Sequence, residues 1–113
     1  MDAPKSWSAQ HRFARISARK VRLTIGLIRG RSCNEAMEQL QFHSRRGGKF
    51  VRDVLKAAMA NADEQEADMG RLYVREAYAD DGPYYRRWRP KDRGRAHPIA
   101  KRTSHILVRL AEV

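Results

Sequence analysis

A basic segment in the last third of the chain constrains the fold more than any other feature. From Asp80 to His105 the sequence reads DDGPYYRRWRPKDRGRAHPIAKRTSH, with eight arginines and lysines and, after the opening aspartate pair, one acid. Its apolar residues are too sparse for an amphipathic helix, and Pro83, Pro90 and Pro98 exclude a long one. The segment must therefore adopt an extended conformation or an irregular one.

Two regular segments flank this basic stretch and alternate between apolar and polar positions. Leu72–Ala79 precedes it and Ser104–Leu110 follows it, and both are rich in β-branched and aromatic residues. We therefore predict a long antiparallel hairpin whose far end, near Asp92–Arg93, leaves the domain. In that register residue 78 lies opposite residue 107, and about ten residues per strand, roughly 33 Å, extend beyond the body.

Such a ribbon cannot bury its own backbone and is only marginally stable alone in water. A partner must supply the missing contacts, and the excess of arginine, whose planar guanidinium matches phosphate oxygens, indicates a polyanion. The chain has a formal net charge of +11, with +7 in residues 1–31, −3 in residues 32–81 and +7 in residues 82–113. The two ends therefore carry the binding charge, and the middle builds the fold.

The residues before the hairpin predict one strand and three helices. We expect residues 1–7 to be a tail and a strand to run from Ser8 to Ile16, with Ala9, His11 and Phe13 on one side. Arg12 and Arg15 make this strand too charged for a central position.

The first predicted helix begins at Ser17 as its N-cap and ends at Gly30 in a left-handed conformation. Its first turns contain Arg19, Lys20 and Arg22, which the helix dipole does not favour there. These cations indicate a second binding surface, and the alternative interpretation is a solvated basic face.

Two further helices follow. Ser32 and Glu35 form a capping box for a short helix, in which Cys33 is a small buried apolar residue. The longest helix begins at Ser44 and presents a continuous apolar stripe between Phe50 and Ala62.

Other classes of function lack the residues that they need. There is no nucleotide-binding glycine loop or zinc-ligand spacing, and the histidines at 11, 43, 97 and 105 have no cysteine or carboxylate cluster beside them. Asp80-Asp81, followed by Gly82-Pro83, predicts a turn rather than a metal site. The lone Cys33 cannot form an internal disulfide, and no apolar run reaches the length of a membrane span. We expect a cytoplasmic protein without cofactor, metal or catalytic activity.

Several motifs, in order along the chain, carry a family resemblance. ARISARKVRLTIGLIRG, then a short helix, then VLKAAMANA, then a GR-A…KRTSH run that ends in an alternating strand, resemble the bacterial large-subunit ribosomal protein L22 family. The similarity extends from about Ser8 to Val113. It implies an α+β fold with a small three-stranded antiparallel sheet packed with three helices and a long protruding basic β-hairpin. Residues 1–113 then form a single domain, with a body at about 8–80 and 103–113 and the hairpin at about 81–102.

The resemblance also implies a function. Members of this family are structural constituents of the large ribosomal subunit that bind 23S rRNA early in assembly, and their hairpin lines the nascent-peptide exit tunnel. The implied partners are large-subunit rRNA, neighbouring large-subunit proteins and the nascent polypeptide, with no membrane and no small-molecule substrate. At the tip the family pattern reads nearer to Pro-Arg-Ala-x-Gly-Arg-Ala, so Lys91 and Asp92 depart from it.

Composition and resemblance together predict the binding residues. Basic side chains are expected on phosphates and aromatic ones on bases or ribose. The predicted rRNA-binding residues are Arg12, Arg15, Arg19, Lys20, Arg22, Tyr84, Tyr85, Arg86, Arg87, Trp88, Arg89, Arg95, His97, Lys101, Arg102 and His105. The predicted tunnel-lining tip consists of Pro90, Lys91, Asp92, Arg93 and Gly94.

The competing interpretation is a free-standing architectural nucleic-acid-binding protein with a basic β-ribbon arm. Such arms often insert apolar wedges between base steps, whereas this tip is nearly all basic residues and glycine. A small enzyme would need a general base or a metal-ligand set, and the sequence offers neither.

Overall fold

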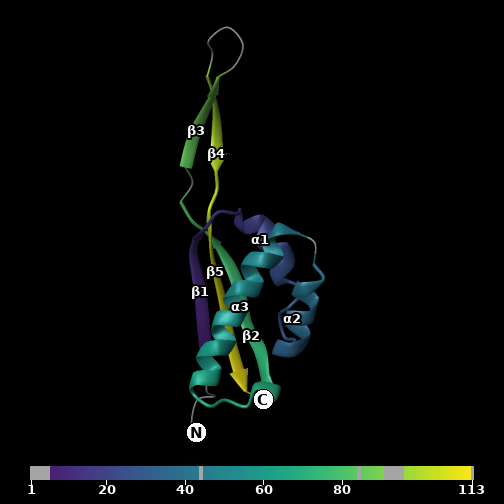
Figure 1. Ribbon diagram of the computed structural model, residues 1–113. Helices are drawn as coiled ribbons and strands as arrows, with labels where there is room; N and C mark the ends of the chain where they lie inside the picture. Colours follow the sequence, from purple (N-terminus) through teal and green to yellow (C-terminus); the bar gives the residue numbers. More distant parts are fainter. Residues whose placement is uncertain (1–5, 44, 84, 91–95, 113) are drawn as a thin grey trace.

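The computed structural model describes residues 6–43, 45–83, 85–90 and 96–112, with the backbone alone for 85–90 and 96–101. The elements are β1 (Ser6–Ala14), α1 (Ala18–Ile25), α2 (Cys33–Gln41), α3 (Arg46–Glu64), a 3-10 helix (Met69–Arg71), β2 (Leu72–Asp81), β3 (Tyr85–Pro90), β4 (Ala96–Lys101) and β5 (Ser104–Glu112). An antiparallel three-stranded sheet has the order β1-β5-β2, and β3 pairs with β4 in a separate two-stranded sheet (Figure 1). The predicted α+β class is confirmed.

The core forms between one face of the three-stranded sheet and the helices. β5 is the central strand, and its Ile106, Val108 and Leu110 are fully buried, as their alternation predicted. The stripe of α3 packs over them, with Val51 and Leu55 at 0% exposure. Burial of this apolar surface, at roughly 25 cal/mol per Å², is the main source of stability.

β1 is an edge strand, as its charge predicted, but its faces differ from the prediction. Trp7 belongs to β1 rather than to a tail: it is 7% exposed, and its indole Nε1 donates to Gln65 Oε1 at 3.0 Å. Pairing with β5 shifts between His11 and Ala14. Because this bulge adds a residue, Phe13 is exposed instead of lying with Ala9 and His11.

β2 pairs with β5 in the predicted register, and Tyr78 lies opposite Leu107. A second bulge between Val74 and Glu76 reverses the alternation, so Ala77 and Ala79 face the core and Tyr78 does not. The turn predicted at Asp80-Asp81 is wrong, because both residues continue β2 and pair with β5.

The helix boundaries differ from the predicted ones at two places. α1 ends at Ile25 rather than near Gly30, because tight turns follow in which the Leu27 and Ile28 amides bond to carbonyls three residues back. Gly30 does adopt the predicted left-handed conformation, with φ 76°. α3 begins at Arg46 with Arg45 in the cap position, and the predicted first residue, Ser44, lies outside the described residues.

The outer edge of β2 is covered by the segment that follows α1. The Gly30 amide donates to the Val74 carbonyl at 3.0 Å, and the Val74 amide donates to the Arg31 carbonyl at 2.9 Å. Further along the strand, the guanidinium Nε of Arg29 donates to the Ala77 carbonyl at 2.8 Å. An open strand edge invites pairing with other chains, and these bonds occupy much of it.

The hairpin joins the body at a tight root. The Gly82 amide donates to the Thr103 carbonyl at 3.0 Å, and the Thr103 hydroxyl donates to the Pro83 carbonyl. A Cβ on Gly82 would lie 2.7 Å from the Thr103 hydroxyl oxygen, so the root needs glycine. Beyond it β3 and β4 pair from Tyr85↔Lys101 to Pro90↔Ala96. Of the predicted tip, Pro90 ends β3, and Lys91, Asp92, Arg93 and Gly94 lie outside the described residues.

Charge is distributed unevenly along α3. Its first turn begins with Arg46 after Arg45, at the end of the body nearest the hairpin (Figure 1). Its last turn contains Asp63 and Glu64, and the acids Glu66 and Asp68 follow directly. The two ends of α3 therefore differ in the sign of their side-chain charges.

Candidate nucleic-acid interface

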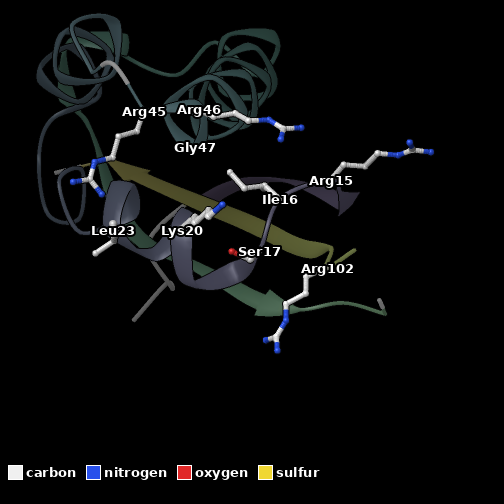
Figure 2. A pocket seen from close by; sticks show the side chains of 9 residues that line it. All are labelled: Arg15, Ile16, Ser17, Lys20, Leu23, Arg45, Arg46, Gly47 and Arg102. Carbon is white, nitrogen blue, oxygen red and sulfur yellow. The ribbon is translucent and has the colours of Figure 1, made fainter. Parts of the chain in front are cut away.

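A cavity of about 610 Å³ opens at the end of the body from which the hairpin projects. Five of the described residues that line it are basic and none is acidic. The lining residues are Arg15, Ile16, Ser17, Lys20, Leu23, Arg45, Arg46, Gly47 and Arg102. In Figure 2, Ser17 and Lys20 lie between the start of α3 on one side and Arg102 on the other.

Four segments that are far apart in the sequence build this cavity. Arg15 follows β1, Lys20 lies in the first turns of α1, Arg45 and Arg46 begin α3, and Arg102 connects β4 to β5. The start of α3 packs directly on α1. A Cβ on Gly47 would lie only 3.1 Å from the Thr24 hydroxyl oxygen, so a residue without a side chain permits this approach.

The cavity is positively charged because its cations have no counter-ions among the described residues. The five basic side chains form no ion pair with any described residue, and Arg46 has one described contact, 5.7 Å from its guanidinium carbon to the Phe50 ring centroid. Like charges placed together without counter-ions repel one another. The amides that begin α1 and α3 add positive partial charge, because the Ser17 side chain makes no cap hydrogen bond and neither does that of Arg45. The arrangement suits a polyanion.

The sequence predicts rRNA binding by Arg15 and by three cations at the start of α1, and the structure gives these four residues different positions. Arg15 and Lys20 line the cavity, and Arg19 is exposed on α1 outside its lining. Arg22 is different: its Nε donates to the Ala79 carbonyl at 3.0 Å, a bond from α1 to the edge of β2. Arg22 therefore helps to hold α1 on the sheet.

Two more predicted residues lie at the end of β1 and the start of β5. Arg12 is exposed, with its guanidinium carbon 5.5 Å from the Phe13 ring centroid. His105 is half-buried, and its Nδ1 accepts a hydrogen bond from the Phe13 amide at 3.1 Å. The body thus brings Arg15, Lys20 and Arg102 together, whereas Arg12 and His105 form a neighbouring group.

Comparison with known proteins identifies the family. The family model for ribosomal protein L22p/L17e matches residues 9–111. The chain belongs to the L22p/L17e family. The large ribosomal subunit protein uL22 of Thermus thermophilus is 51% identical over 102 residues, covering 89% of this chain and 90% of the relative. The protein of the same name from Lacticaseibacillus casei is 46% identical over 112 residues, covering 98% and 96%. That from Caldicellulosiruptor saccharolyticus is 47% identical over 109 residues, covering 96% and 89%.

In this L22p/L17e chain the remaining predicted residues belong to the hairpin. Tyr84, Lys91, Asp92, Arg93, Gly94 and Arg95 lie outside the described residues. The structure places the backbone of eight others in β3 and β4: Tyr85, Arg86, Arg87, Trp88, Arg89, Pro90, His97 and Lys101. Their side chains lie outside the described part of the chain, so their part in binding stays a prediction.

Sequence reasoning missed Arg45 and Arg46, which belong to the site in this L22p/L17e chain. The available clue was their position at the start of a long helix, where the dipole disfavours cations. The same argument identified Lys20 at the start of α1, and it applies equally to α3. Leu23, also missed, is an apolar residue that is 58% exposed at the cavity.

The described part of this L22p/L17e chain offers little basis for a reactive thiol, a metal site or a membrane-spanning helix. Burial raises the pKa of the Cys33 thiol from 9.0 to about 11, which makes it a poor nucleophile. The described residues contain no group of three or more His, Cys, Asp or Glu side chains placed to hold a metal ion. None of the described helices has the length and apolarity that a membrane span requires.

Proposed function

We propose that this chain is a structural constituent of the large subunit of the cytoplasmic ribosome and binds large-subunit rRNA. The relatives at 46–51% identity carry the name of a large ribosomal subunit protein, which supports a structural and not an enzymatic role. The observation that carries the binding proposal is the cavity with five basic side chains and no acid among its described lining residues.

In this proposal the body provides one rRNA contact and the hairpin another. Arg15, Lys20, Arg45, Arg46 and Arg102 contact phosphates of a backbone segment at the cavity, because their charges lack described counter-ions. Arg102 lies at the hairpin root, so a strand of RNA can pass from the cavity to the arm. Arg12, Arg19 and Arg22 lie nearby. Because the Nε of Arg22 bonds to the Ala79 carbonyl, only its other guanidinium N–H groups can contact RNA.

The hairpin forms the second part of the proposal. We assign the body to about 8–80 and 103–113 and the arm to about 81–102, with the basic and aromatic residues of β3 and β4 on rRNA. Neighbouring large-subunit proteins are further partners. Residues Pro90–Gly94 line the exit tunnel and meet the nascent polypeptide. Support comes from the family membership and from the position of β3 and β4 beyond the body (Figure 1).

A charge-neutral triple variant tests the cavity. Lys20→Gln, Arg45→Gln and Arg46→Gln together remove three of its five cations. We expect weaker binding of large-subunit rRNA by the free protein and a slope of log affinity against log salt that flattens by about 2 to 3, since each phosphate contact contributes about 0.7 to 0.9. Filter binding across a salt series measures both.

The matched control removes the same charge elsewhere. Arg31, Lys56 and Arg75 are exposed and do not line the cavity. We therefore expect that their conversion to Gln preserves most of the rRNA affinity and most of its salt dependence. Equal losses in both triples would mean that net charge, and not the cavity, governs binding. Sedimentation separates the proposal from a free-standing nucleic-acid binder, because only a constituent of the subunit co-migrates with large subunits at moderate salt.

A further inference from the structure

Phe13, near the end of β1, is an exposed residue to which the proposed function assigns no role. It is a large apolar residue, yet 50% of its surface is exposed. Its backbone has φ 59°, a left-handed conformation that residues with a bulky side chain rarely adopt. The cause is the bulge in β1: His11 pairs with Ile106 and Ala14 with Ser104, so two residues lie opposite His105.

His105 holds Phe13 in this conformation. Its Nδ1 accepts the hydrogen bond from the Phe13 amide at 3.1 Å. The two rings meet edge to face, with centroids 4.9 Å apart and planes at 87°. The ring is therefore fixed at the surface by a backbone bond and a side-chain contact. A fixed and exposed aromatic ring costs little entropy to bind, because it is already ordered.

The surroundings of the ring indicate what it binds. Arg12 places its guanidinium carbon 5.5 Å from the ring centroid, and Arg15, two residues further on, lines the basic cavity. Phe13 does not line the cavity, but only one residue separates it from Arg15, so an RNA held at the cavity can extend to the ring. Exposed aromatic rings within basic surfaces are the means by which proteins bind unpaired bases, since every base has a face that stacks.

We infer that Phe13 is a stacking platform for an unpaired base of large-subunit rRNA, adjacent to the phosphate contacts at the cavity. The inference rests on the proposed function, which supplies the RNA. Within it, Phe13 provides an uncharged contact to the base, and Arg12, whose guanidinium lies over the ring, contacts the phosphate of that base. Strained backbone conformations of this kind cluster at binding sites.

Replacement of the ring tests the inference in the full-length protein. Phe13→Leu keeps an apolar side chain without a π face, and we expect it to lower the affinity for 23S rRNA about tenfold. Phe13→Asn, which suits the left-handed backbone, loses the same affinity while keeping its melting temperature. Phe13→Tyr keeps the ring and binds as the original does. The loss is the same at every salt concentration, because no charge is removed.

Phe42 provides the control, because it is 84% exposed at the end of α2 and does not line the cavity. Phe42→Leu makes the same chemical change and leaves affinity unchanged. Equal affinity of Phe13→Leu and the original protein overturns the inference, and so does an equal loss in Phe42→Leu. If Phe13→Leu binds free rRNA normally but is incorporated less into subunits, the ring contacts a neighbouring protein and the inference is wrong. Absence of rRNA binding by the original protein would instead contradict the proposed function.

Discussion

At the scale of single residues, cations that look alike in the sequence have different tasks. Arg19 and Arg22 lie three residues apart on α1, but only Arg22 makes a described hydrogen bond, through Nε to the Ala79 carbonyl. Arg29 makes the equivalent bond to Ala77. These two arginines close the outer edge of β2, so the charge of Arg22 also serves the fold.

Arg22→Ala should therefore destabilise the free protein, by about 1 kcal/mol, because the Ala79 carbonyl loses a partly buried charged donor. Arg19→Ala, its neighbour on the same helix, should change stability by less than about 0.5 kcal/mol. Urea denaturation of both variants measures the difference. Equal stability of the two would mean that the Arg22 bond contributes nothing measurable.

Single residues also show where the alternation of apolar and polar positions fails to predict which side chains are buried. In β5 the alternation of Ile106, Val108 and Leu110 predicted the buried face, because no bulge interrupts the strand. In β1 and β2 a bulge adds one residue, and every later side chain then faces the other way. Phe13 and Tyr78 are exposed for this reason. No local residue pattern announced either bulge.

At the scale of elements, two serines in equivalent cap positions differ. Ser32 Oγ accepts from the Glu35 amide at 3.3 Å at the start of α2, as the capping box predicted. Ser17 caps α1 without a side-chain hydrogen bond. A sequence pattern thus predicts where a helix starts more reliably than it predicts the bond that stabilises the start.

This difference gives a paired prediction. Ser32→Ala should lower the free energy of unfolding by about 1 kcal/mol, because an amide of the first turn loses its acceptor. Ser17→Ala should lower it by only a few tenths, since no such bond exists to be lost. Thermal melts of the two variants decide the matter, and a larger loss in Ser17→Ala would refute this account of the caps.

The order of elements along the chain could not reveal which cations meet at the cavity. The family resemblance and the two alternating strands predicted the sheet, the helices and the hairpin. Arg15, Arg45 and Arg102, however, come from parts of the chain that meet only when α3 packs on α1 and the hairpin returns. The sequence identified two of these three cations, and only the tertiary structure shows that they share one site.

At the scale of the whole molecule, the proposed arm and body have separable tasks. The cavity and the root at Gly82 and Thr103 belong to the body end of the hairpin. The proposed tip begins at Pro90, which forms with Ala96 the last described pair of β3 and β4. Deletion of residues 91–93 therefore leaves the core and the cavity untouched.

We expect this deletion to permit folding and incorporation into large subunits, because most basic residues remain. Its effect should appear in the exit tunnel, as altered pausing on particular nascent chains or altered drug response. Sedimentation measures incorporation, and ribosome profiling measures pausing. Loss of incorporation, with normal pausing on the ribosomes that do form, would make the tip an assembly anchor.

The uneven charge along α3 also affects how the free protein meets its RNA. Arg45 and Arg46 lie at one end, and Asp63, Glu64, Glu66 and Asp68 at the other, with the same sign as the dipole of the helix itself. The side-chain charges of α3 therefore add to the dipole of this helix, and the field of a polyanion favours an approach with the start of α3 toward it. We expect encounters to begin more often with the cavity facing the RNA than with the acidic end of α3 facing it.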